Sequence, residues 1–368
     1  MSKNDTVGDF SPDGVPLNAT RWHPDWNNRI LPIFGVIKAI IGVTGLVGNV
    51  VVLLVMYRYR KLFVNVKTAY VINQSVLDAV TSCVLILASF LTVKLLPLME
   101  GLSAELYCRL WLSEILLWGL MSSSTYNLMF ISIERYIAVA HPLLFRTSFS
   151  NVKIRTSIVA IWVCGITYMT LLVIPTSRIS HGWCLLAYFW PSKTVAVAVG
   201  SLTAFLNIVM PIVVHCLCYV RILVILRKRV SPVEPAGPSA MTLSRVPSVS
   251  TGGTALSTSS VRSTVPMRYL HSVGRLPPNQ PSDRSRLSMK TTRNVTKSFA
   301  IVTACFFVCW IPSKTYVFLY RLGTVANFRD TYQYTVILAF LNCCINPFIY
   351  AAKYDAFKKG LAKLFRCG

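Results

Sequence analysis

The sequence has few charged residues and lacks the common signatures of a soluble or catalytic protein. Only 14% of its 368 residues are Asp, Glu, Lys or Arg, whereas 54% are hydrophobic, a balance too apolar for an ordinary soluble domain. No HExxH or GxSxG pattern is present, which argues against a membrane enzyme. No internal repeat is present either, although a transporter built from two related halves would be expected to show one. The first interpretation is a membrane protein that is not an enzyme, with a membrane transporter as a lower-ranked alternative.

Positive charge is in excess, with 37 Lys and Arg against 13 Asp and Glu and a formal net charge of +24. The basic residues fall in the gaps between apolar runs instead of forming one face of a soluble domain. This distribution indicates a lipid bilayer as the partner and argues against nucleic acid.

Seven apolar runs are long enough, at roughly 20 residues or more, to cross the hydrocarbon core of a bilayer as helices. They lack the strict alternation of a membrane barrel, and a helix satisfies its own backbone groups in lipid. The sequence therefore predicts an all-α membrane protein, a seven-transmembrane helix bundle over 30–352. Within it, the range 230–290 is rich in Ser, Thr, Pro and Gly and predicts a disordered cytosolic loop. The predicted spans are 30–57, 66–95, 107–140, 154–175, 193–226, 293–320 and 332–352.

The last residues, 353–368, predict a short amphipathic helix and tail after the seventh span. Phe357, Leu361, Leu364 and Phe365 repeat at helical spacing on one face, as in a helix that lies along the inner leaflet. Cys367 follows that stretch directly, and we expect it to be palmitoylated.

Lys and Arg gather in the first, third and fifth gaps and in the C-terminal tail, which predicts that these segments face the cytosol. The polar residues 1–29 are then an extracellular N-terminal tail without a cleavable signal peptide, and Asn4 and Asn18 lie in glycosylation sequons. Cys108 and Cys184 lie outside the membrane, where disulfides persist, and we expect them to be linked. We expect a multi-pass protein of the plasma membrane with a cytosolic C-terminus.

Glu134 and Arg135 stand together inside an apolar run. A charged side chain near the centre of a membrane helix costs about 2.5–3.5 kcal/mol even on the lenient insertion scale, so such a pair indicates a role. The alternative is an arginine that reaches the interface and forms a surface ion pair with its neighbour.

Each predicted span also carries a characteristic polar, aromatic or proline residue. In chain order these are Asn49, Asp78, the triplet Glu134, Arg135 and Tyr136, then Trp162, Pro211, Tyr219, Phe306, Trp310, Pro312, Asn346, Pro347 and Tyr350. Over roughly residues 30–367 the chain resembles the rhodopsin-like (class A) G-protein-coupled receptors, in which these motifs occur in this order.

The resemblance implies a mechanism. A ligand outside would activate a heterotrimeric G protein inside by an outward movement of the sixth span, 293–320, while Arg135 leaves Glu134 and meets Tyr219 and Tyr350. Arrestin and receptor kinases are further implied partners. No cofactor is implied beyond an allosteric sodium ion, for which the corresponding residues are Asp78, Ser124, Asn342 and Asn346.

Three positions depart from the family pattern. Cys108 and Arg135 are 27 residues apart, where roughly 25 is usual. The register of the outer half of the third span, 107–140, therefore needs a structural explanation. Gln74 stands where a leucine is usual, and Thr292 replaces an acid that often locks the arginine of helix 3.

The ligand is constrained by a few outer residues. Leu117 stands where amine receptors carry an aspartate, which argues against monoamines. The polar N-terminal tail, the expected disulfide and the pattern around Glu134 most resemble receptors for neuropeptides, with a lipid or small acidic metabolite as the alternative. Lys314 is expected either to pair with Glu114 or to receive an acidic group of the ligand, because an unpaired buried ammonium is strongly disfavoured. Lys38 and Lys94 would add positive potential to the same cavity.

Overall fold

The structure is a computed structural model, which describes residues 24–63, 68–90, 101–148, 150–180, 183–185, 191–230, 283–322 and 328–366. Four residues singled out above, Asn4, Asn18, Lys94 and Cys367, lie outside the described residues, as does most of the range 230–290. The expectations that concern them therefore stay predictions.

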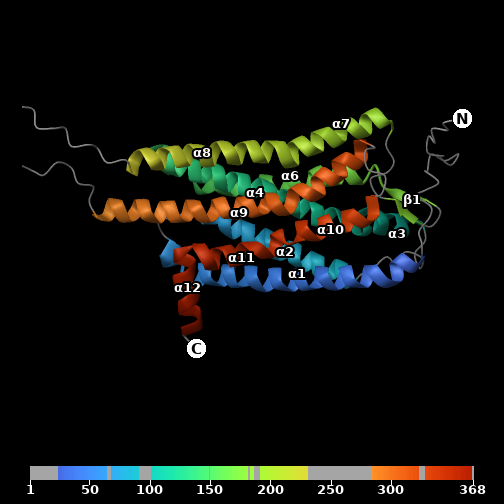
Figure 1. Ribbon diagram of the computed structural model, residues 1–368, viewed down its shortest axis with the longest axis horizontal. Helices are drawn as coiled ribbons and strands as arrows, with labels where there is room; N and C mark the ends of the chain where they lie inside the picture. Colours follow the sequence, from blue (N-terminus) through green and yellow to red (C-terminus); the bar gives the residue numbers. More distant parts are fainter. Residues whose placement is uncertain are drawn as a thin grey trace, which may run out of the picture.

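Long helices run side by side along one direction, and the short helix α12 (Asp355–Arg366) lies across one end of the bundle (Figure 1). The predicted all-α bundle, with a helix after the last span, is confirmed. Its long members, in chain order, are α1 (Pro24–Arg58), α2 (Ala69–Phe90), α4 (Ile115–Ala140), α6 (Asn151–Val173), α7 (Lys193–Ala204) continued by η5 (Phe205–Val209) and α8 (Met210–Val230), α9 (Asp283–Leu322), and α10 (Phe328–Phe340) followed by α11 (Asn342–Lys353).

The remaining described elements are short. They are η2 (Arg60–Phe63), α3 (Gly101–Leu106), η4 (Tyr107–Leu112), α5 (Pro142–Ser148), and the strands β1 (Arg178–Ser180) and β2 (Trp183–Leu185). The two strands pair antiparallel, with Ile179 opposite Cys184. This hairpin lies at the end of the bundle opposite α12 (Figure 1).

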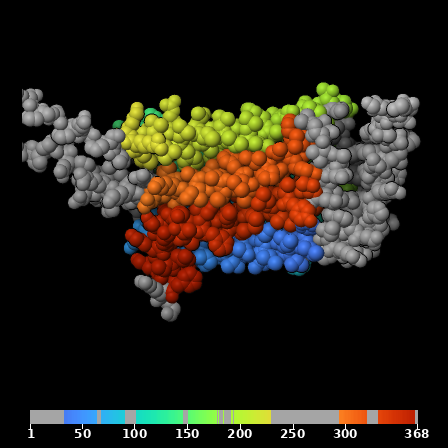
Figure 2. All heavy atoms as spheres, in the orientation of Figure 1, coloured from blue at the N-terminus to red at the C-terminus, as the bar shows by residue number. Residues whose placement is uncertain are grey.

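The outside of the bundle is apolar. On the face that Figure 2 shows, α8, α9, α11 and α1 follow one another, and each exposes large hydrophobic side chains such as Leu217, Val308, Phe348 and Val47. An apolar surface of this extent is what a helix bundle presents to lipid. Within the described residues, six helices are long and apolar enough to cross a membrane.

The helix α4 is not among those six, although it occupies the centre of the bundle and contacts α2, α6, α8 and α9. Its polar side chains lower its hydropathy, and they are buried between helices instead of facing lipid. Those that are fully or almost fully buried include Ser122, Ser123, Ser124, Thr125, Asn127, Ser132, Glu134 and Arg135. The helix missing from the six is thus the third predicted span, which is polar on its inner side.

Two predicted segment boundaries differ from the structure in ways that the sequence explains. The helix α1 begins at Pro24, inside the range assigned to the N-terminal tail, because proline suits the first position of a helix. The helix α9 begins at Asp283, inside the range 230–290 assigned to a loop. Residues 282–311 contain no Gly or Pro, so nothing in the sequence stops the helix from extending beyond the membrane.

The third predicted span, 107–140, is not continuous. The π-helical turn η4 ends at Leu112, and Glu114 then adopts a left-handed conformation with φ 51° and ψ 29° before α4 starts. A π turn and a left-handed residue both take up chain without advancing a regular helix. This irregular segment lies between Cys108 and α4 and accounts for the longer spacing from Cys108 to Arg135.

Proline and asparagine together join α1 to α11. Pro347 has no backbone N–H, so the carbonyl of Cys343, four residues earlier, loses its helical donor. The side chain of Asn49 supplies one, donating from Nδ2 to that carbonyl at 2.8 Å and to the carbonyl of Gly45 at 2.9 Å. Asn49 is fully buried, and its contacts fix the position of α1 against the proline-containing helix.

Candidate functional site

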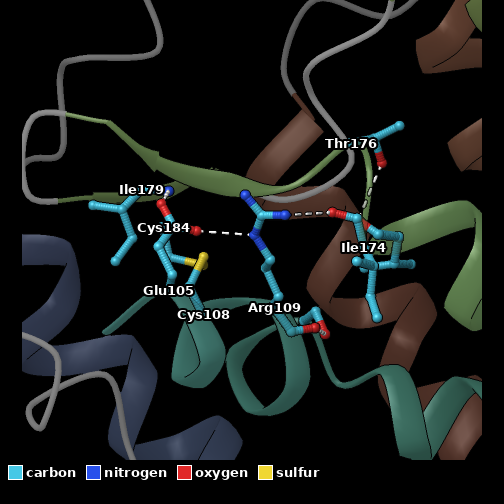
Figure 3. A network of polar contacts seen from close by, with 9 residues as sticks. Glu105, Cys108, Arg109, Ile174, Thr176, Ile179 and Cys184 are labelled. Carbon is cyan, nitrogen blue, oxygen red and sulfur yellow. Dashed lines mark hydrogen bonds and ion pairs between the residues drawn. A yellow bond between two sulfur atoms is a disulfide. The ribbon is translucent and has the colours of Figure 1, made fainter. Parts of the chain in front are cut away.

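At the end of the bundle where β1 lies, a disulfide joins Cys108 of η4 to Cys184 of β2, with Cα atoms 5.5 Å apart, as the sequence predicted. Glu105 and Arg109, one helical turn apart, flank this bond (Figure 3). Oε1 of Glu105 accepts the backbone N–H of Ile179 at 3.2 Å. Nη1 of Arg109 donates to the carbonyl of Ile174 at 3.3 Å. The hairpin and the end of α6 are thus both tied to the segment that precedes α4.

Two lysines lie against aromatic rings near this end of the bundle. Lys38 donates to Oε1 of Glu114 at 3.0 Å, and its Nζ lies 5.3 Å from the ring centre of Phe340. Lys314 places its Nζ 4.7 Å from the ring centre of Trp118 and 4.5 Å from that of Trp310. Both distances fall within the range of cation–π attraction.

Glu114 forms an ion pair with Lys38, a partner that was not expected from the sequence. The left-handed backbone at Glu114 places its carboxylate on the α1 side of the bundle. Leu117 is fully buried and lies in the regular part of α4, so its position can be counted from Arg135 without crossing the irregular segment.

The four residues expected to form the sodium site are all buried. Asn346 donates to Oδ2 of Asp78 at 2.7 Å, and Ser124 donates to Oδ1 at 3.4 Å. Asn342 lies on α11 with Oδ1 lacking a hydrogen-bond partner among the described residues. Gln74, which sequence reasoning noted only as a departure, also donates to both oxygens of Asp78, at 3.1 and 3.2 Å.

At the other end of α4, Arg135 pairs with Glu134, with Nη2 2.8 Å from Oε2. The side chains are 8% and 0% exposed, so the pair is shielded from water and is not a surface ion pair. The guanidinium also lies 5.7 Å from the ring centre of Phe299 on α9. The next residue, Tyr136, has its ring edge toward His141, just beyond α4.

Polar contacts next to the arginine join α4, α8 and α9. Ser132 is hydrogen-bonded to Nδ1 of His215 at 2.7 Å, and its hydroxyl lies 3.3 Å from that of Tyr219. The Tyr219 hydroxyl also lies 3.4 Å from that of Thr303 on α9. The sequence motifs identified Tyr219 alone. For the other members of this group, the one signal in the sequence was His215, because a histidine within a span is unusual, whereas Ser and Thr are common in such helices.

The motif residues of α9 and α11 form an aromatic column. Phe306 lies 5.7 Å from Trp310, and Tyr350 lies 6.0 Å from Phe299 and 6.3 Å from Phe357. Tyr350 is fully buried, and its hydroxyl has no hydrogen-bond partner among the described residues. On the opposite side of the bundle, Nε1 of Trp162 donates to Oδ1 of Asn73 at 2.9 Å.

Two of the proline motifs also have structural consequences. Pro211 lies two residues after the end of the π-helical turn η5, which contains Asn207, the residue four positions earlier. Pro312 lies inside α9 without ending it. Each proline removes one backbone hydrogen bond and makes its helix easier to bend at that point.

Comparison with known proteins decides what this arrangement belongs to. The chain matches the family described as 7 transmembrane receptor (rhodopsin family) over residues 48–350. The chain belongs to this family. The resemblance seen in the motifs is thus confirmed, and the chain is a receptor of this family instead of a membrane transporter.

Individual relatives are distant. Galanin receptor 2b of Danio rerio is 23% identical over 375 residues, covering 96% of this chain and 82% of the relative. Somatostatin receptor type 2 of Mus musculus is 24% identical over 367 residues, with the same two shares. Alpha-1A adrenergic receptor of Oryzias latipes is 23% identical over 374 residues, covering 96% of this chain and 72% of the relative. The protein is a membrane receptor and not an enzyme.

Proposed function

We propose that this receptor binds a neuropeptide outside the cell and activates a heterotrimeric G protein inside it. Binding would allow α9 to move outward at the end of the bundle where Arg135 lies. The observation that supports this most directly is the shielded pair of Arg135 and Glu134 beside α9. A desolvated ion pair next to a movable helix has two discrete arrangements, closed and separated, which is the requirement for a switch.

The neighbours of Arg135 are suited to the separated arrangement. Tyr350 is buried within the same cluster of rings as Phe299, and its hydroxyl has no hydrogen-bond partner among the described residues. Tyr219 contacts Thr303 of α9 only at 3.4 Å. An outward movement of α9 would remove that contact, after which both tyrosines would be available to the guanidinium.

A neuropeptide is favoured over an amine for two reasons. Galanin and somatostatin receptors are among the relatives, and the adrenergic relative is outweighed by the buried Leu117 at the position where amine receptors carry an aspartate. A buried leucine offers no partner for an ammonium group.

Lys314 supports an acidic group on the ligand. Its ammonium lies over two indole faces, and Glu114 forms its ion pair with Lys38. Nε1 of Trp310, also buried, has no hydrogen-bond partner among the described residues. A cation and an N–H donor close together suit a carboxylate, whether it is an acidic side chain or the C-terminus of a peptide. The same chemistry keeps a small acidic metabolite or a lipid as the second candidate.

The remaining expectations form part of the proposal. The receptor would lie in the plasma membrane with its N-terminus outside, glycans on Asn4 and Asn18, and palmitate on Cys367. Arrestin and receptor kinases would act at the same end of the bundle as the G protein.

The decisive experiment is ligand-independent nucleotide exchange. Purified receptor in lipid nanodiscs would be mixed with a panel of purified G proteins, and Arg135→Ala would be compared with Arg109→Ala, a matched change at the opposite end of the bundle. We expect Arg135→Ala to lower exchange to that of empty nanodiscs, and Arg109→Ala to preserve it. Normal exchange by a folded Arg135→Ala receptor would remove the proposed mechanism.

A further inference from the structure

A continuous chain of buried hydrogen bonds crosses the bundle from α6 to α2. Trp162 Nε1 donates to Asn73 Oδ1 at 2.9 Å, and Asn73 Nδ2 donates to Asn127 Oδ1 at 2.9 Å. Asn127 Nδ2 donates to Gln74 Oε1 at 2.9 Å. Gln74 Nε2 then donates to both carboxylate oxygens of Asp78. The four members that follow Trp162 are at most 7% exposed, so water does not compete with these bonds.

The direction of this chain is fixed by its first member. An indole N–H can only donate, so Asn73 must present its oxygen to Trp162 and its amide N–H₂ to Asn127. Asn127 must therefore present its oxygen to Asn73 and its N–H₂ group to Gln74. This N–H₂ group also donates to the carbonyl of Tyr70 at 2.8 Å. Gln74 is left with its oxygen toward Asn127. Its N–H₂ group therefore has to face Asp78.

Three donor groups surround the carboxylate of Asp78, and the two hydrogens of the Gln74 amide are shared among its acceptors. A carboxylate has roughly four lone-pair positions. Oδ1 receives Gln74 and Ser124, and Oδ2 receives Gln74 and Asn346. The hydroxyl oxygen of Ser124 is engaged as well, because Nε2 of Gln74 is also hydrogen-bonded to it.

These contacts do not fit the sodium ion that the family pattern implies. Of the four residues expected to hold it, Asp78 and Ser124 already direct their oxygens toward an N–H₂ group. The oxygens that lack a hydrogen-bond partner among the described residues are Oδ1 of Asn342 and Oδ1 of Asn346, and both are neutral. The N–H and O–H groups that point at the carboxylate occupy the positions from which a cation would have to bind it.

We propose that the side-chain amide of Gln74 takes the place of the sodium ion. Both bring partial or full positive charge to the carboxylate of Asp78, but the amide belongs to the protein and is present at every salt concentration. The receptor is therefore insensitive to sodium, and a leucine at position 74 would create a sodium site.

Thermal unfolding of the purified receptor tests this without knowledge of the ligand or the G protein. The unfolding temperature would be measured in about 150 mM sodium chloride and in choline chloride of the same concentration, because an ion that binds only the folded state raises that temperature. For the natural sequence we expect the same value in both salts. A rise in sodium that Asp78→Asn abolishes would overturn the proposal, and this comparison needs no change at Gln74.

Gln74→Leu provides the complementary result. Its own loss of stability is common to both salts, so only the difference between them matters. We expect an unfolding temperature about 3 °C higher in sodium than in choline, and no difference after the further change Asp78→Asn. Equal values for a folded Gln74→Leu receptor would show that Gln74 is not what excludes the ion. If that variant does not fold, Gln74→Met, similar in length and without donors, is to be compared in the same way and judged by the same outcomes.

Discussion

Replacing Glu134 by glutamine should make the receptor active without a ligand. The change keeps the shape of the side chain and removes its charge, so the resting state loses the 2.8 Å ion pair with Arg135. The pair is almost fully buried, and we take for this ion pair a contribution of about 1.5–3 kcal/mol, the usual range for a polar contact to a charged group. Since about 1.4 kcal/mol is a factor of ten, the ratio of active to resting receptor should rise by about 10-fold to 160-fold.

The expected signal is large enough to measure. If about 1% of the receptor is active without ligand, a value within the usual range for a minor state, Glu134→Gln would raise it to between about 10% and 60%. The assay is ligand-independent nucleotide exchange per receptor in nanodiscs. Glu105→Gln is the matched control, because Glu105 also pairs with an arginine, at 2.9 Å, but at the opposite end of the bundle. Exchange by Glu134→Gln at or below the natural level, with receptor amounts equal, would refute the reasoning.

Three further predictions concern the outer end and the packing. Lys314→Gln should weaken an acidic agonist about tenfold or more in a binding assay while leaving a neutral analogue unaffected. Gly165→Ala should lower the free energy of unfolding by about 2–3 kcal/mol, and with it the unfolding temperature. The new Cβ would overlap the Ser123 hydroxyl and lie 2.7 Å from the backbone nitrogen of Ser123. Gly35→Ala is the control and should fold normally, because its nearest contact would be at 3.6 Å. Cys108→Ser should reduce folded receptor at the cell surface, since the disulfide closes a separation of 76 residues and contributes at most about 4.5 kcal/mol; a Cys184 replacement added to it should cause no further loss.

The helices could be predicted from sequence because lipid imposes one simple requirement. A span must be apolar outside and satisfy its own backbone, and both features are visible in a run of residues. The bends could not be predicted as reliably. Glu114 carries no Gly or Pro signal, and its left-handed conformation follows from the disulfide at Cys108 and the start of α4, which are tertiary features. The helix boundaries failed at Pro24 and Asp283 because hydropathy marks the membrane and not the end of the helix.

The candidate site was predicted residue by residue, but its pairings were not. The sequence identified Lys38, Glu114 and Lys314 as outer charges, and only the turn at Glu114 determines that Lys38 is its partner. Likewise, Gln74 was visible as an unusual residue. Its meaning depends on the indole of Trp162, three residues further along the hydrogen-bond chain and on another helix. Periodicity within one helix carries no information on such a bond between helices.

The longer spacing from Cys108 to Arg135 affects the choice of ligand. If the extra residues lay within α4, Leu117 would not occupy the position at which amine receptors carry an aspartate, and the argument against an amine would fail. The irregular turn ends at Glu114, and α4 is a regular helix from Ile115 onward. Counting back from Arg135 therefore assigns the buried Leu117 to that position. The positive charge is supplied instead by Lys314, which is why the ligand is expected to carry the acid.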